Sequence, residues 1–313
     1  MTELTLGKIR HLQQISSEQG IFSIAALDHR DAFVEMLGKA IEVEQLPWES
    51  VAEEKVRMTR ALAPHVSAVL LDPLYGVGPA IQRGALPGSV GLLVAREQSG
   101  YKPHHAGRIT VLMDDWDSGA IKRVGSAAVK LLLYYHPDAP NARDQEDVVR
   151  RVAEECKTHD IPFLLEPLCY PLDPAQKKTD ADFARIRPEL VIESVRRLVP
   201  LGVDVLKAEF PTDPARETDE GRMRAACRQL SQASVAPWVL LSAGVNFEMF
   251  KMQVQIACEA GASGFVAGRA IWQEGLQLPD PSDRERFYRT QAAVRLQALK
   301  EIAAAYGRPW YEH

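Results

Sequence analysis

The residues with the clearest chemical potential are charged groups within, or at the ends of, apolar runs. Of the twelve lysines, Lys130 lies in the run AAVKLLLYY and Lys207 in VDVLKAEFP, and none of the others lies in an expected strand. Glu166 lies in PFLLEPL, and Asp28 comes near the end of FSIAALDH. Burying an unpaired ammonium among helices costs several kcal/mol or more, so we expect both lysines to point into a polar site.

This grouping is typical of an amine nucleophile with a proton-transfer partner. An amine attacks a ketone only when neutral, and an ordinary lysine, with a pKa near ~10.4, is almost fully protonated at pH 7. A second cation and partial desolvation lower the pKa of an amine, and Lys130 could supply that charge to Lys207. Glu166 could be the acid and base. The structural alternative is that Lys207 pairs with Glu166 or Asp28 and only holds the fold together.

Small residues and an arginine follow the last two apolar runs. Ser242-Ala243-Gly244 follow PWVLL, and Gly268-Arg269 follow GFVA. Backbone N–H groups can approach an anion closely at glycines, a helix beginning near Asn246 adds its dipole, and a guanidinium binds phosphate in bidentate fashion. We therefore expect a phosphate site here. The alternative is that the glycines form ordinary turns and Arg269 a surface ion pair.

Eight short apolar runs, most of them separated by amphipathic segments, would position these groups. The expected strands are Phe22–His29, Ser67–Pro73, Gly91–Glu97, Ala127–Tyr135, Pro162–Leu168, Val203–Pro211, Pro237–Gly244 and Gly264–Ala270. Parallel strands that are covered on both faces have such near-continuous apolar runs. The sequence predicts one (β/α)8 TIM barrel over residues 1–313, with an open doubly wound sheet as the alternative.

Helical periodicity is clearest between these runs. The expected helices are Trp48–Ala63, Arg143–Thr158, Pro188–Val199, Ala215–Ala233, Phe247–Ala260 and Pro281–Ala305, with an extra N-terminal helix at Leu4–Ser17 that would cover the barrel floor. The segment Gln98–Val124 shows no clear pattern, and His104-His105 within it are expected to be exposed to solvent. Barrel enzymes place their site at the C-terminal strand ends, where the charged residues lie.

Composition narrows the choice of partners. A net charge of −5 argues against binding to nucleic acid or to anionic membranes. The four cysteines contain no CxxC pair, and no apolar run reaches ~18 residues. We therefore expect free thiols, no membrane span and a cytoplasmic location. No cluster has metal-ligand spacing, so we expect no metal or other cofactor.

Six motifs, in the order of the expected strands, resemble the tagatose 1,6-bisphosphate aldolase family, which also includes sulfofructose-phosphate aldolases. They are ALDHR at Ala26–Arg30, VKLLLYY at Val129–Tyr135, LLEPL at Leu164–Leu168, VDVLKAEFP at Val203–Pro211, LLSAGV at Leu240–Val245 and GRAIW at Gly268–Trp272. The resemblance covers about residues 20 to 275. It implies class I aldolase chemistry on a (β/α)8 barrel and a homo-oligomer.

The resemblance also implies roles for single residues. Lys207 would form the Schiff base, Glu166 would be the acid and base, and Lys130 its partner. Asp28 would lie near the substrate, and the anion pocket would contain Ser242, Ala243, Gly244, Gly268 and Arg269. His29 and Arg30 are expected to contact the substrate. Many members have glutamine at the position of His29, and the run GASGFVAGRAIW is as close to the sulfosugar members as to the tagatose members.

We therefore expect reversible cleavage of a ketose phosphate. The first expectation is tagatose 1,6-bisphosphate, which gives dihydroxyacetone phosphate and glyceraldehyde 3-phosphate. The alternatives are a sulfofructose-phosphate aldolase, an isomerase or metal-dependent aldolase on the same barrel, and a non-catalytic regulator that binds a sugar phosphate.

Overall fold

The eight apolar runs form eight parallel strands that close into a barrel. The computed structural model describes residues 4–104, 107–213 and 215–313. The strands are β1 Phe22–Leu27, β2 Ala68–Leu71, β3 Gly91–Ala95, β6 Ala128–Tyr135, β7 Phe163–Cys169, β8 Val205–Ala208, β9 Trp238–Leu241 and β10 Gly264–Ala267. Their order around the barrel is β1-β10-β9-β8-β7-β6-β3-β2. The closed barrel is confirmed, and the open sheet is excluded.

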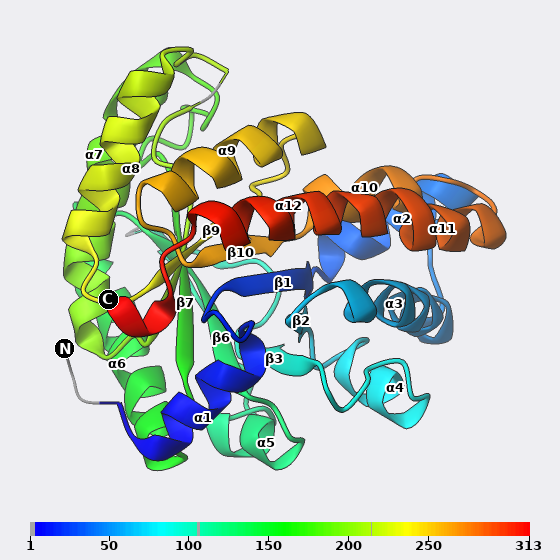
Figure 1. Cartoon of the computed structure of the whole chain (residues 1–313). Helices are drawn as coiled ribbons and strands as arrows, with labels where there is room; N and C mark the ends of the chain where they lie inside the picture. Colours follow the sequence, from blue (N-terminus) through cyan, green and yellow to red (C-terminus); the bar gives the residue numbers. More distant parts are fainter. Residues whose placement is uncertain (1–3, 105–106, 214) are drawn as a thin grey trace.

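Helices surround the strands (Figure 1). They are α2 Asp31–Ile41, α3 Trp48–Leu62, α4 Val77–Gln82, α5 Ser118–Arg123, α6 Ala142–Thr158, α7 Ala181–Leu198, α8 Glu220–Ala233, α9 Phe247–Glu259, α10 Arg269–Leu276, α11 Pro281–Phe287 and α12 Ala293–Tyr306. A π-helical turn, Tyr288–Ala292, joins α11 to α12, and short 3₁₀ turns lie at Ala63–His65, Val199–Leu201 and Trp310–Glu312.

Two of the predicted helix starts were wrong. The helix α7 begins at Ala181 rather than at Pro188, because this proline lies inside the helix, where it removes one backbone hydrogen bond without ending the helix. The helix α8 begins at Glu220 rather than at Ala215. The carboxylate of Asp219 accepts hydrogen bonds from the N–H groups of Gly221 and Arg222, and so fixes this start.

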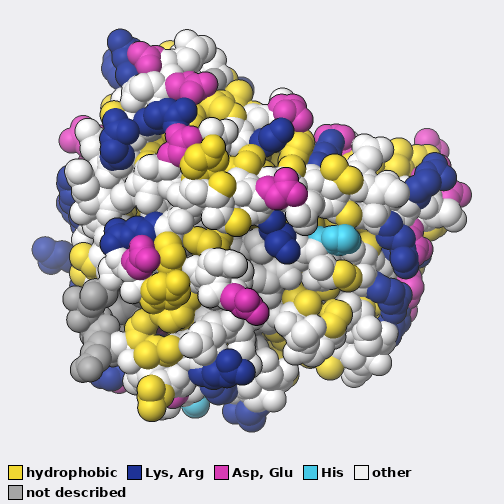
Figure 2. Space-filling view, viewed as in Figure 1, with side chains coloured by type: hydrophobic (Ala, Val, Ile, Leu, Met, Phe, Trp, Pro, Cys, Tyr) yellow, Lys and Arg dark blue, Asp and Glu magenta, His cyan; other side chains and the backbone are white. Residues whose placement is uncertain are grey.

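The predicted N-terminal helix is α1, Leu6–Ile15, and it covers one end of the barrel. Leu12 and Ile15 are buried against the interior side chains of the barrel. The indole of Trp310 donates a hydrogen bond to Ser16 Oγ at 3.1 Å, so the C-terminal segment lies on the same side of the barrel as α1 (Figure 1). Hydrophobic side chains gather beside this segment in Figure 2. This end is closed, which leaves the opposite end for chemistry.

The predicted alternation along the strands is confirmed at β8. Val205 belongs to the cluster inside the barrel, whereas Leu206 and Ala208 belong to the cluster between strands and helices. Lys207 therefore shares its face with Val205.

The segment Gln98–Val124, in which the sequence shows no clear pattern, contains a hairpin and a short helix. Strands β4, Lys102–His104, and β5, Gly107–Ile109, pair antiparallel, and α5 follows. Lys102 therefore lies in a strand, contrary to the prediction that only two lysines do. His105 lies outside the described residues. A bridge between Glu97 and Leu112 closes the base of the hairpin, which thus extends from the C-terminal end of β3. Among the described residues, no helix is long and apolar enough to cross a membrane.

A buried ion pair ties α3 to the ends of β1 and β2. Lys55 Nζ contacts Asp72 Oδ2 at 2.7 Å and donates to the backbone oxygens of Leu27 and His29, and both charged side chains are fully buried. It therefore holds the backbone on both sides of Asp28.

Lys55→Met is expected to lower the melting temperature by several degrees. It leaves the Asp72 carboxylate buried without a cation, at a cost of about 3–5 kcal/mol. The double variant Lys55→Met with Asp72→Asn removes that charge and should recover part of the loss in thermal unfolding, as coupled neighbours do. A double variant less stable than Lys55→Met alone would contradict this account.

Candidate active site

Lys207 and Glu166 meet at the open end of the barrel. Lys207 Nζ lies 2.8 Å from Glu166 Oε2, and both side chains are more than nine-tenths buried. The two come from neighbouring strands, β8 and β7, and point inward because of the alternation along each strand. The ion pair that sequence analysis gave as the structural alternative is thus present. It also places a proton acceptor in contact with the amine.

Lys130, on β6, lies in a cage of three carboxylates. Its ammonium is 2.7 Å from Asp28 Oδ2, 2.9 Å from Glu97 Oε1 and 3.1 Å from Glu166 Oε2. Burial alone would lower the pKa of Lys130, but the carboxylates, Asp28 first, outweigh it and raise this pKa above its ordinary value. Lys130 therefore stays protonated.

The pKa values of the carboxylates shift in the opposite direction to that of Lys130. Burial alone would raise the pKa of Glu166, but Lys207 and then Lys130 lower it below its ordinary value. Burial opposes ionisation of Asp28 in the same way, and the same two ammoniums lower its pKa. Both acids are therefore ionised at neutral pH, and each can accept a proton.

Glu97 is a member of the site that sequence analysis did not single out. Its Oε1 also accepts a hydrogen bond from Arg30 at 3.0 Å, and its Oε2 accepts one from the N–H of Leu132 at 2.9 Å. The only sequence signal was its place at the end of an expected strand. Arg30, expected to contact the substrate, therefore also orients Glu97.

His29 lies beside Asp28 as a neutral ring. Burial, opposed in part by the Asp28 carboxylate, lowers the pKa of His29 to about 3. Its ring packs edge-on against Trp272, with centroids 5.2 Å apart, and its Nδ1 is buried without a hydrogen-bond partner among the described residues. A neutral ring with a free nitrogen can exchange a hydrogen bond with a sugar hydroxyl.

The predicted anion loops lie together beyond β9 and β10. The N–H of Gly268 donates to Ser242 Oγ at 3.3 Å. Ala243 and Gly244 have left-handed backbone, with φ of 48° and 80°. A Cβ atom on Gly244 would lie 2.9 Å from the Arg269 guanidinium carbon, so the guanidinium covers this glycine closely. The loops after β9 and β10 thus bring a cation and small residues together.

A cavity of about 260 Å³ connects most of these groups. It is lined by Asp28, His29, Arg30, Asp31, Ala32, Glu97, Gln98, Ser99, Gly100, Lys130, Leu132, Tyr134, Glu166 and Lys207. The anion loops are not part of its lining, but they adjoin it, because a Cβ on Gly268 would lie 2.9 Å from the His29 ring. Glu209, on the same strand face as Lys207, is held elsewhere by the N–H of Cys169 at 2.8 Å and Lys178 at 3.2 Å.

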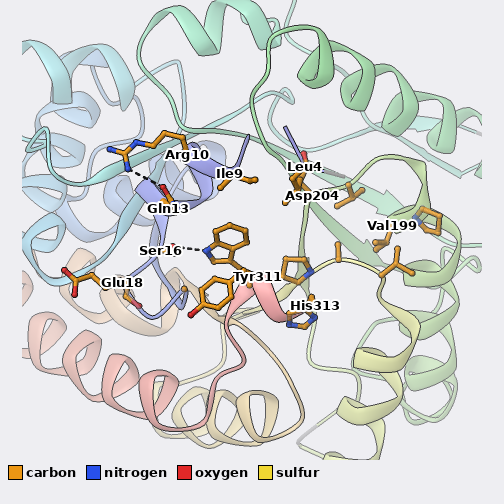
Figure 3. A pocket seen from close by; sticks show the side chains of 18 residues that line it. Leu4, Ile9, Arg10, Gln13, Ser16, Glu18, Val199, Asp204, Tyr311 and His313 are labelled. Atoms are coloured by element: carbon orange, nitrogen blue, oxygen red, sulfur yellow. Dashed lines mark hydrogen bonds between the residues drawn. The ribbon is translucent and has the colours of Figure 1, made fainter. Parts of the chain in front are cut away.

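A larger cavity, of about 940 Å³, lies at the closed end of the barrel (Figure 3). Leu4, Ile9, Val199 and Tyr311 are among its lining residues, and Asp204, which also lines it, is paired with Lys8 at 2.7 Å. Neither Lys130 nor Lys207 lines it. We therefore place the candidate active site in the smaller cavity.

The sequence profile of the DeoC/LacD family aldolases matches residues 22–274. The chain belongs to the DeoC/LacD aldolase family. Aldolases are carbon–carbon lyases, and the predicted membership of an aldolase family is confirmed.

Relatives match along nearly the whole chain. It is 35% identical to the tagatose 1,6-diphosphate aldolase 2 of Enterococcus faecalis, over 99% of this chain and 98% of that protein. It is 32% identical to the tagatose 1,6-diphosphate aldolase of Listeria monocytogenes serotype 4a, over 99% and 96%. These matches cover every strand of the barrel.

Solved structures share the fold. The fructose-bisphosphate aldolase of Plasmodium falciparum superposes with a TM-score of 0.72 at 14% identity, covering 98% of both chains. A Schiff-base-forming fructose-1,6-bisphosphate aldolase superposes with a TM-score of 0.61 at 18% identity, covering 95% of this chain and 99% of the other. This aldolase therefore has the barrel of both enzymes.

Lys130→Met is expected to destabilise this aldolase more at pH 8 than at pH 5. In the parent, the lowered pKa of Asp28 and Glu166 gives stability that is present above their unfolded pKa of about 4 and is lost only as pH falls through the folded pKa. Without Lys130, Lys207 alone of these two cations opposes burial, so both pKa values rise relative to the parent. The native state of the variant then takes up protons at a higher pH than the parent does, and the deficit shrinks on acidification.

Melting temperatures of parent and variant at the two pH values measure this effect. Lys157→Met, at a side chain that is 74% exposed, is the matched control. An equal deficit at pH 5 and pH 8 would contradict the electrostatic account.

Proposed function

We propose that this protein is a class I aldolase that cleaves tagatose 1,6-bisphosphate reversibly to dihydroxyacetone phosphate and glyceraldehyde 3-phosphate. One observation carries the mechanism: two buried ammoniums share Oε2 of Glu166, and among the described residues only one of them, Lys130, contacts further carboxylates. The names of the full-length relatives support the substrate.

The same observation supports our choice of the nucleophile. Lys130 contacts three carboxylates and stays protonated, so its amine has no free electron pair. Lys207 contacts one carboxylate, Glu166, which can take its proton directly. We therefore assign the attack on the ketone to Lys207 and the fixed positive charge to Lys130.

The reaction then follows from the contacts. Lys207 Nζ adds to the C2 carbonyl, and Glu166 transfers the protons that turn the carbinolamine into an iminium and water. Glu166 next takes the proton of the C4 hydroxyl. The C3–C4 bond breaks, its electrons form an enamine, and glyceraldehyde 3-phosphate leaves. Protonation at C3 and addition of water release dihydroxyacetone phosphate and restore Lys207.

The remaining residues hold the substrate in this proposal. Ser242, Gly244, Gly268 and Arg269 bind the C1 phosphate through backbone N–H groups and a guanidinium. Asp28 and His29 face the sugar hydroxyls from the lining of the cavity. Because His29 is neutral above pH 5, its contact with the sugar does not change across the physiological pH range.

Borohydride reduction in the presence of dihydroxyacetone phosphate should attach the ketone covalently to Lys207. Peptide mass mapping locates the adduct, and Lys207→Met should abolish both adduct and cleavage. Lys157→Met is the control and should keep both. An adduct on Lys130, or no adduct although ligand binds to folded protein, would sink the Schiff-base assignment and leave an isomerase or a sugar-phosphate-binding regulator.

Glu166→Gln is expected to lower kcat by about 10²–10⁴, the usual contribution of general acid–base catalysis. The amide keeps the shape of the side chain but cannot accept the proton from Lys207. Steady-state cleavage of tagatose 1,6-bisphosphate, fructose 1,6-bisphosphate and sulfofructose 1-phosphate measures this loss and ranks the substrates. Parent activity should persist with a chelator, and its loss there would favour a metal-dependent aldolase.

We also propose that the enzyme works in the cytoplasm as a homo-oligomer. The four cysteines are free and buried, and burial raises the pKa of each to about 12, which suits a reducing compartment. Light scattering on the purified protein tests the oligomeric state.

A further inference from the structure

Hydrogen bonds hold the hairpin β4–β5 at the rim of the catalytic cavity. The N–H of Gln98 donates to the oxygen of Val111 at 2.8 Å at its base. Asn141, at the start of α6, donates to the oxygen of Arg108 at 2.9 Å, and the N–H of Arg108 donates to the hydroxyl of Tyr170 at 3.2 Å. The hairpin backbone around Arg108 is thus fixed to the loops that follow β6 and β7.

The Arg108 guanidinium lies among three tyrosine rings. Its central carbon is 4.5 Å from the ring centroids of Tyr101 and Tyr170, and 5.1 Å from that of Tyr134. Tyr101 and Tyr134 also pack edge-to-face, 4.8 Å apart. Cation–π contacts with three rings restrict the position of a guanidinium before any ligand arrives.

This environment leaves the donors of Arg108 available. Within the described residues, its side chain forms no ion pair and donates no hydrogen bond. Rings satisfy the faces of a guanidinium, whereas its N–H groups point outward in the plane. A cation held in this way matches a tetrahedral oxyanion, which accepts two parallel hydrogen bonds from one guanidinium.

Arg108 lies on the opposite side of the barrel mouth from the proposed C1-phosphate loops. Those loops follow β9 and β10, whereas the hairpin follows β3 and rests on Tyr134 of β6. Around the barrel, three strands separate β9 from β3 in either direction, and three separate β10 from β6. Arg108 and the loops with Arg269 therefore face each other across the mouth of the barrel. The cavity with Lys207 lies between them, and Tyr134 lines it.

We infer that Arg108 is the binding residue for a second oxyanion, on C6 of the substrate, and that it selects substrates with anionic groups at both ends. This inference rests on the proposed aldolase function. Phosphate and sulfonate share the required chemistry, since both present several oxygens to a guanidinium.

The test compares substrates that differ only at C6. They are a ketose 1,6-bisphosphate, the corresponding 1-phosphate with a free C6 hydroxyl, and the 6-sulfo 1-phosphate. Arg108→Gln should lower kcat/KM for both doubly anionic substrates on the order of 10- to 100-fold, as expected for lost charge-assisted hydrogen bonds. The 1-phosphate should change by less than about 2-fold, because it makes no contact with Arg108.

Two more variants make the test independent of hairpin folding. Arg108→Lys keeps the charge but loses the bidentate grip, so its loss on doubly anionic substrates should be smaller than that of Arg108→Gln. Lys102→Gln is the matched control: Lys102 pairs with Ile109, so it lies on the opposite face of the hairpin from Arg108. It should leave the substrate ratio unchanged.

The outcomes separate the two hypotheses. An unchanged ratio of bisphosphate to 1-phosphate cleavage in both Arg108 variants, with an active parent, would overturn the C6 assignment alone. A parent that cleaves none of the three substrates would overturn the aldolase function and this inference with it. The doubly anionic substrate that the parent cleaves faster identifies the group at C6.

Discussion

The site depends on one buried ammonium, Lys130, that is surrounded by carboxylates from three other segments. Asp28 follows β1, Glu97 follows β3, and Glu166 lies in β7, so the cage forms only when the barrel has closed in this register. Desolvating a lone ion costs several kcal/mol, and the contacts between Lys130 and these carboxylates offset part of that cost. The cluster is therefore a strong constraint on the native arrangement of the strands.

The same constraint separates the roles of the two lysines. Both were candidates from their strand positions, and both contact one oxygen of Glu166. The difference lies in their other neighbours: Lys130 gains Asp28 and Glu97, which stabilise its proton. Lys130 is thus surrounded by carboxylates on three sides, whereas Glu166 is the carboxylate that Lys207 contacts among the described residues, and this difference is the basis of the roles proposed for the two lysines.

The two ends of the barrel differ in what covers them. At one end, α1 and Trp310 cover the interior side chains. At the other end, the loops are free to carry polar groups, and the excursion after β3 adds a hairpin that brings Arg108 over Tyr134. Groups on opposite sides of the mouth come from different strand ends, so one barrel can hold the two anion sites that we propose.

Much of this arrangement is determined by local sequence. The apolar runs have the length and composition of buried parallel strands, and the period of two along a strand sets Lys207 on the inner face with Val205. Charged residues at several strand ends were enough to predict which end of the barrel contains the candidate active site, because all C-terminal ends of a parallel barrel meet at one rim. The grouping of Lys130, Lys207, Glu166 and Asp28 follows from these local rules.

Other features depend on contacts between distant segments, which local periodicity does not encode. Glu97 becomes a partner of Lys130 and Arg30 only through barrel closure, and Lys55 meets Asp72 through the packing of α3. The hairpin at β4–β5 is too short to show a pattern, and docking on Asn141 and Tyr170 stabilises it. The sequence alone thus determined the barrel and its reactive end, whereas tertiary structure decided which charges neutralise one another, because electrostatic energy depends on distance in space rather than along the chain.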